Sequence, residues 1–219
     1  MSITFYGHPF SSYCQKVQCA LYENAVPFAY RMLDPDHPEN AEKLGKLWPI
    51  GKFPVLVDDD QAVIESSIII EYLDLMYPGP VRLIPEDQTA ALEVRFMDRF
   101  FDNHIQTPMQ AIVSNALREV TDRDPLGVKQ ARTRLETAYG WLDGQMDGRH
   151  WAAGKTFGLA DCAAAPALFY ADWIHPIAPA CSHVRAYRQR LLARSSFARC
   201  VEEARPYRPL FPLGAPDAD

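Results

Sequence analysis

The sequence predicts an α/β domain with a mixed four-stranded sheet, followed by an all-α domain. Two observations lead to this fold class. Short β-branched or alternating runs occur only in the first part of the chain, where helical patterns separate them. Beyond Tyr77-Pro78-Gly79-Pro80, which ends a helical pattern, the β signal almost disappears. We therefore expect a first domain over residues 1–80, a linker over 81–87 and a helical domain over 88–219.

The elements of the first domain are predicted in the order β-α-β-α-β-β-α, which is thioredoxin-like. In such sheets a hairpin supplies the antiparallel part. The expected elements are a strand at 3–6, a helix from Ser11-Ser12 to about Asn24, a strand at 28–32, a short helix at 39–47, a hairpin of 55–57 and 62–64, and a helix that follows Ser67.

The second domain is predicted to contain five helices and a proline-rich tail. One long helix is expected from 88 to about 120, bent near Thr107-Pro108 because proline disturbs a helix interior. The others are expected at 127–146, 158–173, 184–192 and 196–204, and the third, as the most apolar, should be central. The tail from Arg205 to Pro212 is expected to lie extended.

Composition limits the function classes. The chain of 219 residues has 48% hydrophobic and 23% charged residues, a balance typical of globular proteins. A net charge of −6 argues against nucleic acid or anionic membrane as the main partner. The start shows no signal-peptide pattern, and no apolar run is long enough to span a bilayer. Five scattered cysteines without a CxxC pair favour a reducing, cytoplasmic location and predict neither a disulfide framework nor a metal site.

The stretch from Pro49 to Ser67 carries the strongest chemical signal. Pro54 opens a strand and offers no N–H to the sheet, so the backbone of Phe53 is available to another molecule. Glu65-Ser66-Ser67 precedes a helix, where hydroxyls and free N–H groups accept an anion and the carboxylate accepts a cation. A ligand with a peptide backbone, a carboxylate and an ammonium would satisfy all three. The alternative is that Ser66 only caps its helix.

Gly51-Lys52-Phe53-Pro54-Val55-Leu56 and Ile64-Glu65-Ser66 resemble the glutathione-binding half of the cytosolic glutathione S-transferase family. The resemblance implies a cis peptide bond before Pro54 and contacts to glutathione from Lys52, from the Phe53 backbone and from the Glu65-Ser66 pair. It also implies that His37 contacts the glycine end of glutathione. The alternative is that His37 is a solvated loop residue. It covers the second domain more generically, where Gly158 to Asp161 is similar to an N-capping box with glycine in place of serine or threonine.

The thiol of glutathione is the reactive group in this family. A free cysteine thiol has a pKa of about 8.5, and a hydroxyl donor at a helix N-terminus can lower it. Ser11 and Ser12 are both candidates, and Ser11 matches the zeta-like and tau-like serine when counted back from Val17. Tyr6 is a weaker alternative. Ser11-Ser12-Tyr13-Cys14 has the spacing of a CxxC motif in which serine replaces the first cysteine. That first cysteine is the attacking thiolate of thiol-disulfide enzymes, so disulfide reduction is disfavoured.

The second substrate is expected between the domains, in a pocket to which we assign Phe10, His104, Pro108 and Met109. His104 is of interest because a polar group there could act on the electrophile. The alternative is a histidine that only makes contacts between helices. The resemblance implies a serine-type glutathione transferase that acts on small hydrophobic electrophiles in detoxification, as a homodimer with glutathione as co-substrate. The alternatives are a binding or interaction protein of the same fold with little catalysis, a glutathione-dependent isomerase or dehalogenase, and a reductase acting through Cys14.

Overall fold

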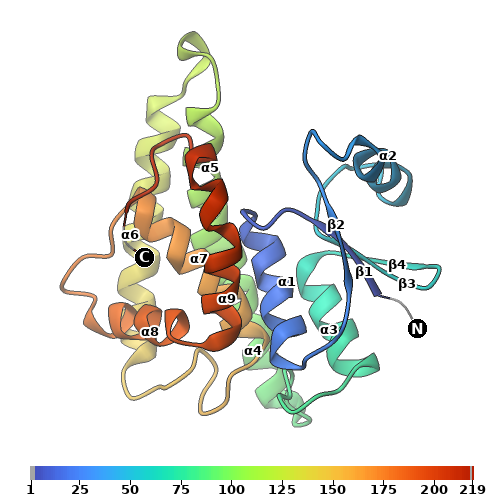
Figure 1. The fold of residues 1–219 in the computed structure, drawn as a ribbon. Helices are drawn as coiled ribbons and strands as arrows, with labels where there is room; N and C mark the ends of the chain where they lie inside the picture. The colour runs from blue at the N-terminus through green and yellow to red at the C-terminus, as the bar shows by residue number, and fades with distance from the viewer. Residues whose placement is uncertain (1–2, 218) are drawn as a thin grey trace.

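The computed structural model describes residues 3–217 and 219, and it has the predicted fold class. The chain forms a small α/β domain and a larger helical domain that pack side by side (Figure 1). Among the described residues, no helix combines the length and the apolar character needed to cross a membrane.

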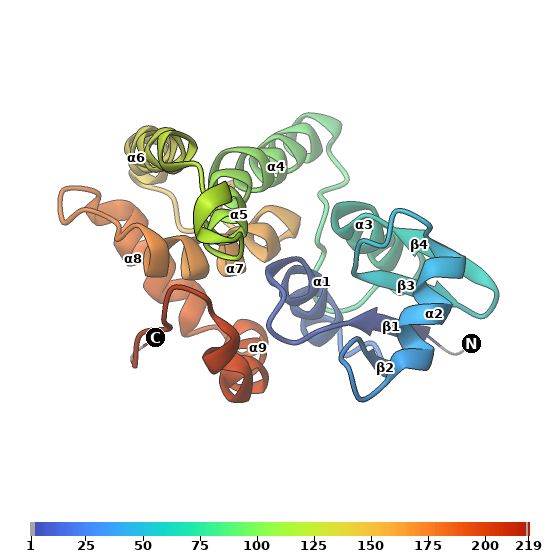
Figure 2. The ribbon, with the colours of Figure 1, turned by 90° about the horizontal axis from the view of Figure 1, so that it is seen from above.

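The first domain is built on a mixed sheet in the order β2-β1-β3-β4. Strand β1 (Ile3–Gly7) pairs in parallel with β2 (Ala29–Met32) and antiparallel with β3 (Val55–Asp58), which forms a hairpin with β4 (Gln61–Ile64). Helix α1 (Ser12–Glu23) and helix α3 (Ser66–Met76) cover the face towards the helical domain, and α2 (Pro38–Leu47) lies on the other face (Figure 2).

The helical domain begins with three helical segments in direct succession. Helix α4 (Gln88–Phe100) continues into a π-helix, η1 (Phe101–Gln106), and then into α5 (Thr107–Ala116). The N–H of Thr107 donates to the carbonyl of Asp102, five residues earlier, which is the π pattern. A bend was predicted near Thr107-Pro108, and α4 and α5 do run in different directions (Figure 2). The change of direction coincides with the π-helix just before Thr107, whereas Pro108 falls in the first turn of α5, where proline is tolerated.

The rest of the helical domain is arranged around α7 (Leu159–Ile174). Its other segments are a 3₁₀ turn η2 (Val120–Asp122), α6 (Pro125–Met146), α8 (Ser182–Leu192) and α9 (Ser195–Ala204). Helix α7 is central as predicted, since it is buried over almost its whole length. The tail was predicted to be extended, but it starts with a 3₁₀ helix, η3 (Arg205–Leu210), because proline at its first turn is already set for helical φ.

Gly158, at the start of α7, has a steric reason to be glycine. A Cβ atom there would lie 2.7 Å from the carbonyl oxygen of Leu83, which accepts a hydrogen bond from the N–H of Leu159. The carboxylate of Asp161 accepts bonds from the N–H groups of Gly158 and Ala152 and from the hydroxyl of Tyr187. The cap of α7 is therefore tied to the linker between the domains.

Candidate active site

Two adjoining cavities lie where α1 begins. A cavity of about 550 Å³, here called the polar cavity, is lined by Ser11, Tyr13, Trp48, Lys52, Phe53, Pro54, Glu65, Ser66, Arg99, Asp102, Asn103, Thr107, Gln110 and Ser114. A cavity of about 620 Å³, the apolar cavity, is lined by His8, Phe10, Ser11, Ser12, Leu33, Asp34, Pro35, Phe53, Met109, Gln110, Val113, Leu117, Tyr170, Leu210, Phe211 and Pro212. Ser11, Phe53 and Gln110 line both.

Ser11 is the N-cap of α1. Its backbone is extended, and its Oγ accepts a long bond of 3.4 Å from the N–H of Cys14. The hydroxyl also lies beside the thiol of Cys14, whose pKa it lowers against the effect of burial, and it faces the junction of the two cavities, close to the N–H groups of the first helical turn. A hydroxyl in this position can donate to an anion that lies between the cavities.

Ser12 has a different environment. It is buried, and its Oγ accepts a hydrogen bond from Nε2 of Gln106, a buried residue of η1. The other amide atom, Oε1 of Gln106, is buried without a hydrogen-bond partner in the described part of the chain. The Ser12 hydroxyl therefore joins the turn before α1 to the helical domain. Ser12 is also one of the residues that line the apolar cavity.

The peptide bond between Phe53 and Pro54 is cis. This agrees with what the family resemblance implies, and it leaves the Phe53 backbone at the wall of the polar cavity. Across this cavity, Glu65 precedes α3 with φ of +70°, a left-handed conformation unusual for a residue with a side chain. Ser66 follows as the first residue of α3, so its N–H is among the free donors of that helix start.

Lys52 lines the polar cavity, whereas His37 lines neither cavity. The Nδ1 atom of His37 lies 2.7 Å from Oδ1 of Asp34, and this hydrogen bond raises the pKa of the exposed imidazole. Asp34 itself belongs to the apolar cavity. The role predicted for His37 at the glycine end stays a prediction that this pairing does not favour.

A buried ion network forms one wall of the polar cavity. The Nζ of Lys16, which is 1% exposed, lies 2.7 Å from Asp98 and 2.8 Å from Asp102 and donates to Ser67. Arg99 pairs with the same two carboxylates and also contacts Ser67. Burial raises the pKa of Asp102, and the charge of Lys16 opposes this. Two cations and two carboxylates balance, so the network fixes α1 and α3 against α4 and η1 without net charge.

The residues predicted for the second substrate separate into two groups. Phe10 and Met109 line the apolar cavity, where the ring of Phe10 packs edge-on against Tyr170 and Phe211. His104 and Pro108 line a different cavity, between α4 and α6, and His104 packs on Phe100 there. They do not meet Ser11 in either of its cavities, because η1 turns them to another side of the helix.

Two alternatives to the serines are disfavoured by their surroundings. Tyr6 is buried with Leu44 and Val55 in a cluster on the α2 side of the sheet. Cys14 is fully buried, and burial raises the pKa of its thiol to about 12. A thiol of this kind is a poor nucleophile at neutral pH.

His8 closes the apolar cavity beside the turn. Its Nδ1 accepts a 3.1 Å hydrogen bond from the N–H of Phe10, and its ring packs edge-on against Tyr207 of η3. Burial lowers the pKa of this imidazole. The neutral ring therefore holds the backbone that leads to Ser11.

Several residues of the site were not predicted. In the polar cavity, Thr107, Gln110 and Ser114 form a polar stripe on α5 at helical spacing, and this pattern in an otherwise apolar segment was the available signal. Trp48, Arg99 and Asp102 gave no local signal. Leu210 and Phe211, from the end of η3, complete the apolar cavity from the far end of the chain.

The described residues contain no group of three or more His, Cys, Asp or Glu side chains that could hold a metal ion. The two cavities offer hydroxyl and amide donors, one balanced ion network and an apolar space of about 620 Å³.

Comparisons with known proteins point in one direction. Residues 5–81 match the model of the glutathione S-transferase N-terminal domain, and residues 109–190 match that of its C-terminal domain. The chain is 27% identical over 205 residues to a stringent starvation protein A homolog of Coxiella burnetii, covering 92% of each. It is 29% identical over 158 residues to glutathione S-transferase U1 of Arabidopsis thaliana, covering 72% of this chain and 64% of the plant protein.

Among solved structures, a glutathione S-transferase of Methylobacterium radiotolerans in complex with glutathione sulfonate superposes with a TM-score of 0.79. The sequence identity is 26%, and the match covers 92% of this chain and 95% of the other.

Proposed function

Because the chain belongs to the glutathione S-transferase family, we propose that it activates the glutathione thiol at Ser11 and transfers the thiolate to a small apolar electrophile. One observation carries this proposal: Ser11 stands at the junction of a polar cavity suited to a peptide and an apolar cavity suited to the electrophile. A sulfur atom beside Ser11 would be within reach of both.

The polar cavity offers a complementary group for each part of glutathione. The Phe53 backbone before cis-Pro54 suits the cysteinyl amide, and Lys52 suits the glycyl carboxylate. Ser66, with the free N–H groups of α3, suits the γ-glutamyl carboxylate, while Glu65 suits its ammonium. These assignments are those predicted from the sequence, with His37 left outside the cavity.

The chemistry requires a thiolate and a leaving path for its proton. At neutral pH a free thiol is only a few per cent ionised. Ser11 donates its hydroxyl hydrogen to the sulfur, and the α1 N-terminus adds a favourable potential, so both lower the thiol pKa. The thiol proton passes to water. The sulfur lone pair then forms a bond to the electrophilic carbon in the apolar cavity, and the electron pair displaced there leaves with the departing group or is protonated by solvent.

A second candidate function is a binding protein with little catalysis. It is supported by the names of the relatives, since the family includes chains called stringent starvation protein A homologs beside chains called glutathione S-transferases. Family membership alone therefore does not decide between catalysis and binding. Isomerisation or dehalogenation with glutathione, the homodimer and the cytoplasmic location also stay expectations.

The test compares glutathione binding, bound-thiol ionisation and conjugation to a chloronitrobenzene for wild type, Ser11→Ala and Ser12→Ala. We expect Ser11→Ala to bind glutathione within a few-fold of wild type, but to lose about a hundredfold in kcat/KM and to raise the pKa of the bound thiol. Ser12→Ala should keep that pKa.

The outcomes separate the candidates. If Ser12→Ala alone raises the pKa of the bound thiol, the family function stands and the residue assignment is wrong. If wild type does not bind glutathione at millimolar concentration, the binding-protein function is favoured. Full activity in Cys14→Ser eliminates a reductase that acts through Cys14.

A further inference from the structure

His8 and Ser11 are the first and last residues of a β-turn. The carbonyl of His8 accepts a 3.0 Å hydrogen bond from the N–H of Ser11, and Pro9 occupies the second position, where proline is favoured. The Cα atoms at the two ends of such a turn lie within about 7 Å of each other. His8 is therefore a close neighbour of the residue that we propose to act on the glutathione thiol, and both residues line the apolar cavity.

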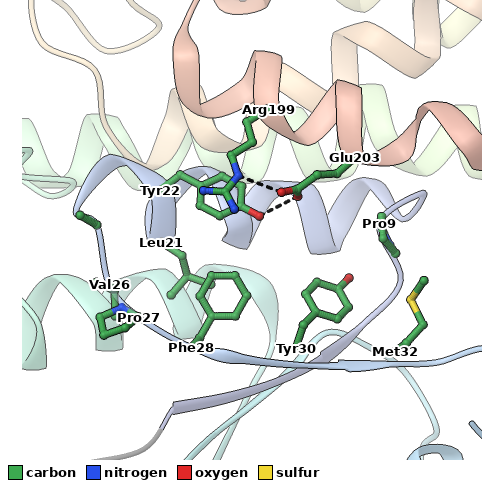
Figure 3. Close-up of a pocket in the computed structure, with 11 residues that line it drawn as sticks. Pro9, Leu21, Tyr22, Val26, Pro27, Phe28, Tyr30, Met32, Arg199 and Glu203 are labelled. Atoms are coloured by element: carbon green, nitrogen blue, oxygen red, sulfur yellow. Dashed lines mark hydrogen bonds and ion pairs between the residues drawn. The ribbon is translucent and has the colours of Figure 1, made fainter.

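The turn is held firmly in place. Gln15, which is fully buried, donates from Nε2 to the carbonyl of Pro9 at 2.9 Å. Figure 3 shows Pro9 next to Met32 at the end of β2, where both line a third cavity that has no lining residue in common with the apolar cavity. The turn thus separates two cavities, with Pro9 at one of them and His8 and Ser11 at the other.

The hydrogen bonding of His8 determines which of its nitrogens can donate. Nδ1 accepts a 3.1 Å bond from the N–H of Phe10, so in the neutral ring the hydrogen is on Nε2. Burial lowers the pKa of the imidazole, which favours this neutral form. Nε2 has no hydrogen-bond partner within residues 3–217 and 219, and it is open to solvent, unlike the unpartnered polar atoms that the fold encloses. The wall of the apolar cavity therefore carries an N–H donor that a bound molecule can use.

Asp34 stands at the same end of the apolar cavity as His8. Strands β1 and β2 are parallel, and their ladder continues past the strand ends, because the N–H of Leu33 donates to the carbonyl of Gly7 at 2.9 Å. His8 and Asp34 directly follow these two residues, and both line the apolar cavity. Burial lowers the pKa of His8, and the charge of Asp34 is near enough to oppose this effect.

Asp34 brings a negative charge to this end of the cavity. Its Oδ1 atom accepts from the N–H of Asp36 and lies 2.7 Å from Nδ1 of His37, which lines neither active-site cavity. Oδ2 of Asp34 has no hydrogen-bond partner in the described part of the chain. The carboxylate of a substrate would be repelled by this charge, whereas a neutral oxygen acceptor would meet the N–H of His8 without that penalty.

We propose that His8 determines specificity for the second substrate: its Nε2–H donates to the carbonyl oxygen of a neutral α,β-unsaturated ketone or aldehyde while the glutathione sulfur attacks. This inference rests on the proposed transferase function. In such an electrophile only two carbon atoms separate the attacked carbon from the oxygen. That separation suits the short span of a turn that has Ser11 at one end and His8 at the other.

The reaction is an addition without a leaving group. The sulfur beside Ser11 forms a bond to the β-carbon, the electrons of the C=C bond move to the carbonyl oxygen, and the resulting enolate oxygen accepts from Nε2–H of His8. The α-carbon then takes from water the proton that the thiol had released to it. His8 keeps its own hydrogen throughout, so it stabilises charge and does not act as an acid.

Two variants that each keep one nitrogen function of His8 test the proposal. In His8→Asn the amide oxygen can still accept from the N–H of Phe10, but the donor at the position of Nε2 is lost. In His8→Gln the amide nitrogen takes the place of Nε2–H. We expect His8→Asn to lower kcat/KM about thirtyfold for phenylbutenone but less than about threefold for benzyl chloride, whose displaced charge leaves on chloride. His8→Gln should recover most of the loss with phenylbutenone.

Glutathione binding and Ser11→Ala are the controls. His8 does not line the polar cavity, so both His8 variants should bind glutathione within about twofold of wild type in calorimetric titration. Ser11→Ala should slow both electrophiles. Equal losses for the two electrophiles in His8→Asn, or a His8→Gln variant as slow as His8→Asn with phenylbutenone, overturn the role of His8. No conjugation of either electrophile by wild type overturns the proposed function, and this inference with it.

The preference for a neutral substrate has its own test. Benzylidenepyruvate carries a carboxylate where phenylbutenone carries a methyl group. In Asp34→Asn the side chain keeps an oxygen for the N–H of Asp36 but loses its charge. We expect this variant to raise kcat/KM for the acid relative to the ketone by about threefold. An unchanged ratio overturns the part assigned to Asp34.

Discussion

Helix α1 meets the helical domain along two sides of opposite character. Towards α4 and η1 it presents Lys16 to two buried carboxylates, so that side is charged and each ion has a partner. Towards α9 it presents Cys19, whose Sγ lies 4.0 Å from that of Cys200, and both thiols are fully buried. That side is polar at its ends, where Glu23 pairs with Arg194 and Tyr22 donates to Glu203, so only its centre at the two thiols is uncharged.

The difference shows how one short helix can be held against its neighbours in two unlike ways. On the charged side, geometry is fixed by ion pairs whose loss leaves a buried charge. At the uncharged centre of the α9 side, the contact depends on close packing of apolar atoms. The four predictions below test this contrast, beginning with the largest expected effect.

Replacing Lys16 with Met should lower the free energy of unfolding by about 3–5 kcal/mol, because Asp98 and Asp102 lose their buried cation. The midpoint of urea unfolding measures this. Lys129→Met, on the exposed face of α6, is the matched control and should change stability by less than about 0.5 kcal/mol. Equal midpoints for the two variants would contradict a structural role of the network.

Ser12→Ala should cost about 2 kcal/mol, since the buried amide of Gln106 then loses the hydrogen bond that joins the turn to η1. Ser11→Ala removes a long N-cap bond and should cost about 1 kcal/mol. The two unfolding curves, measured in one buffer, give the order. A larger loss for Ser11→Ala would reverse the structural assignment of the two serines.

Cys19→Ser should destabilise the protein by about 1 kcal/mol more than Cys19→Ala, because the buried thiol of Cys200 is only a weak hydrogen-bond partner for a hydroxyl. Thermal unfolding under reducing conditions measures the difference. If serine is tolerated better than alanine, the centre of the α9 side accepts polar atoms, and its contrast with the Lys16 side of α1 fails.

His8 should give the smallest effect, visible as a pH dependence. Burial lowers the pKa of His8 in the folded state below its ordinary value of 6.5. The unfolded chain therefore binds this proton first, so the contribution is present above pH 6.5 and is lost as the pH falls through 6.5 towards the folded pKa.

Protonation would also remove the acceptor at Nδ1 that holds the N–H of Phe10. His8→Asn, whose amide oxygen can accept the same bond, should show a flatter stability profile over this range. Identical slopes in wild type and His8→Asn would contradict the assignment.

The first domain was predictable because its chemistry is local in sequence. Phe53-Pro54, Glu65-Ser66 and Ser11-Ser12 are neighbours along the chain, and the strands around them have clear β patterns. The roles of these residues in glutathione binding and catalysis stay predictions. Contacts such as Ser12 to Gln106, which are 94 residues apart, leave no local pattern and come only from tertiary packing.

The same reason applies in the helical domain. His104, Pro108 and Met109 were expected at the second substrate because they lie near the predicted bend, but a π-helix changes which side of the helix each residue faces, and its hydrogen-bond register is not visible in the sequence. Gly158 was noted as a replacement of the usual cap residue. The steric reason for this glycine is the carbonyl oxygen of Leu83, which lies 75 positions earlier in the sequence. A contact between such distant residues leaves no local sequence pattern.

The π-helix η1 has a consequence for how this site can change by mutation. A π-turn holds one more residue than an α-turn, so deleting one residue within 101–106 would restore regular α spacing while α4 and α5 keep nearly the same orientation. Gln110 and Ser114 would then stay at the wall of the polar cavity. A single-codon deletion in this segment would thus rearrange Asp102 and Gln106 and leave the α5 side chains in place, a change that no one substitution reproduces.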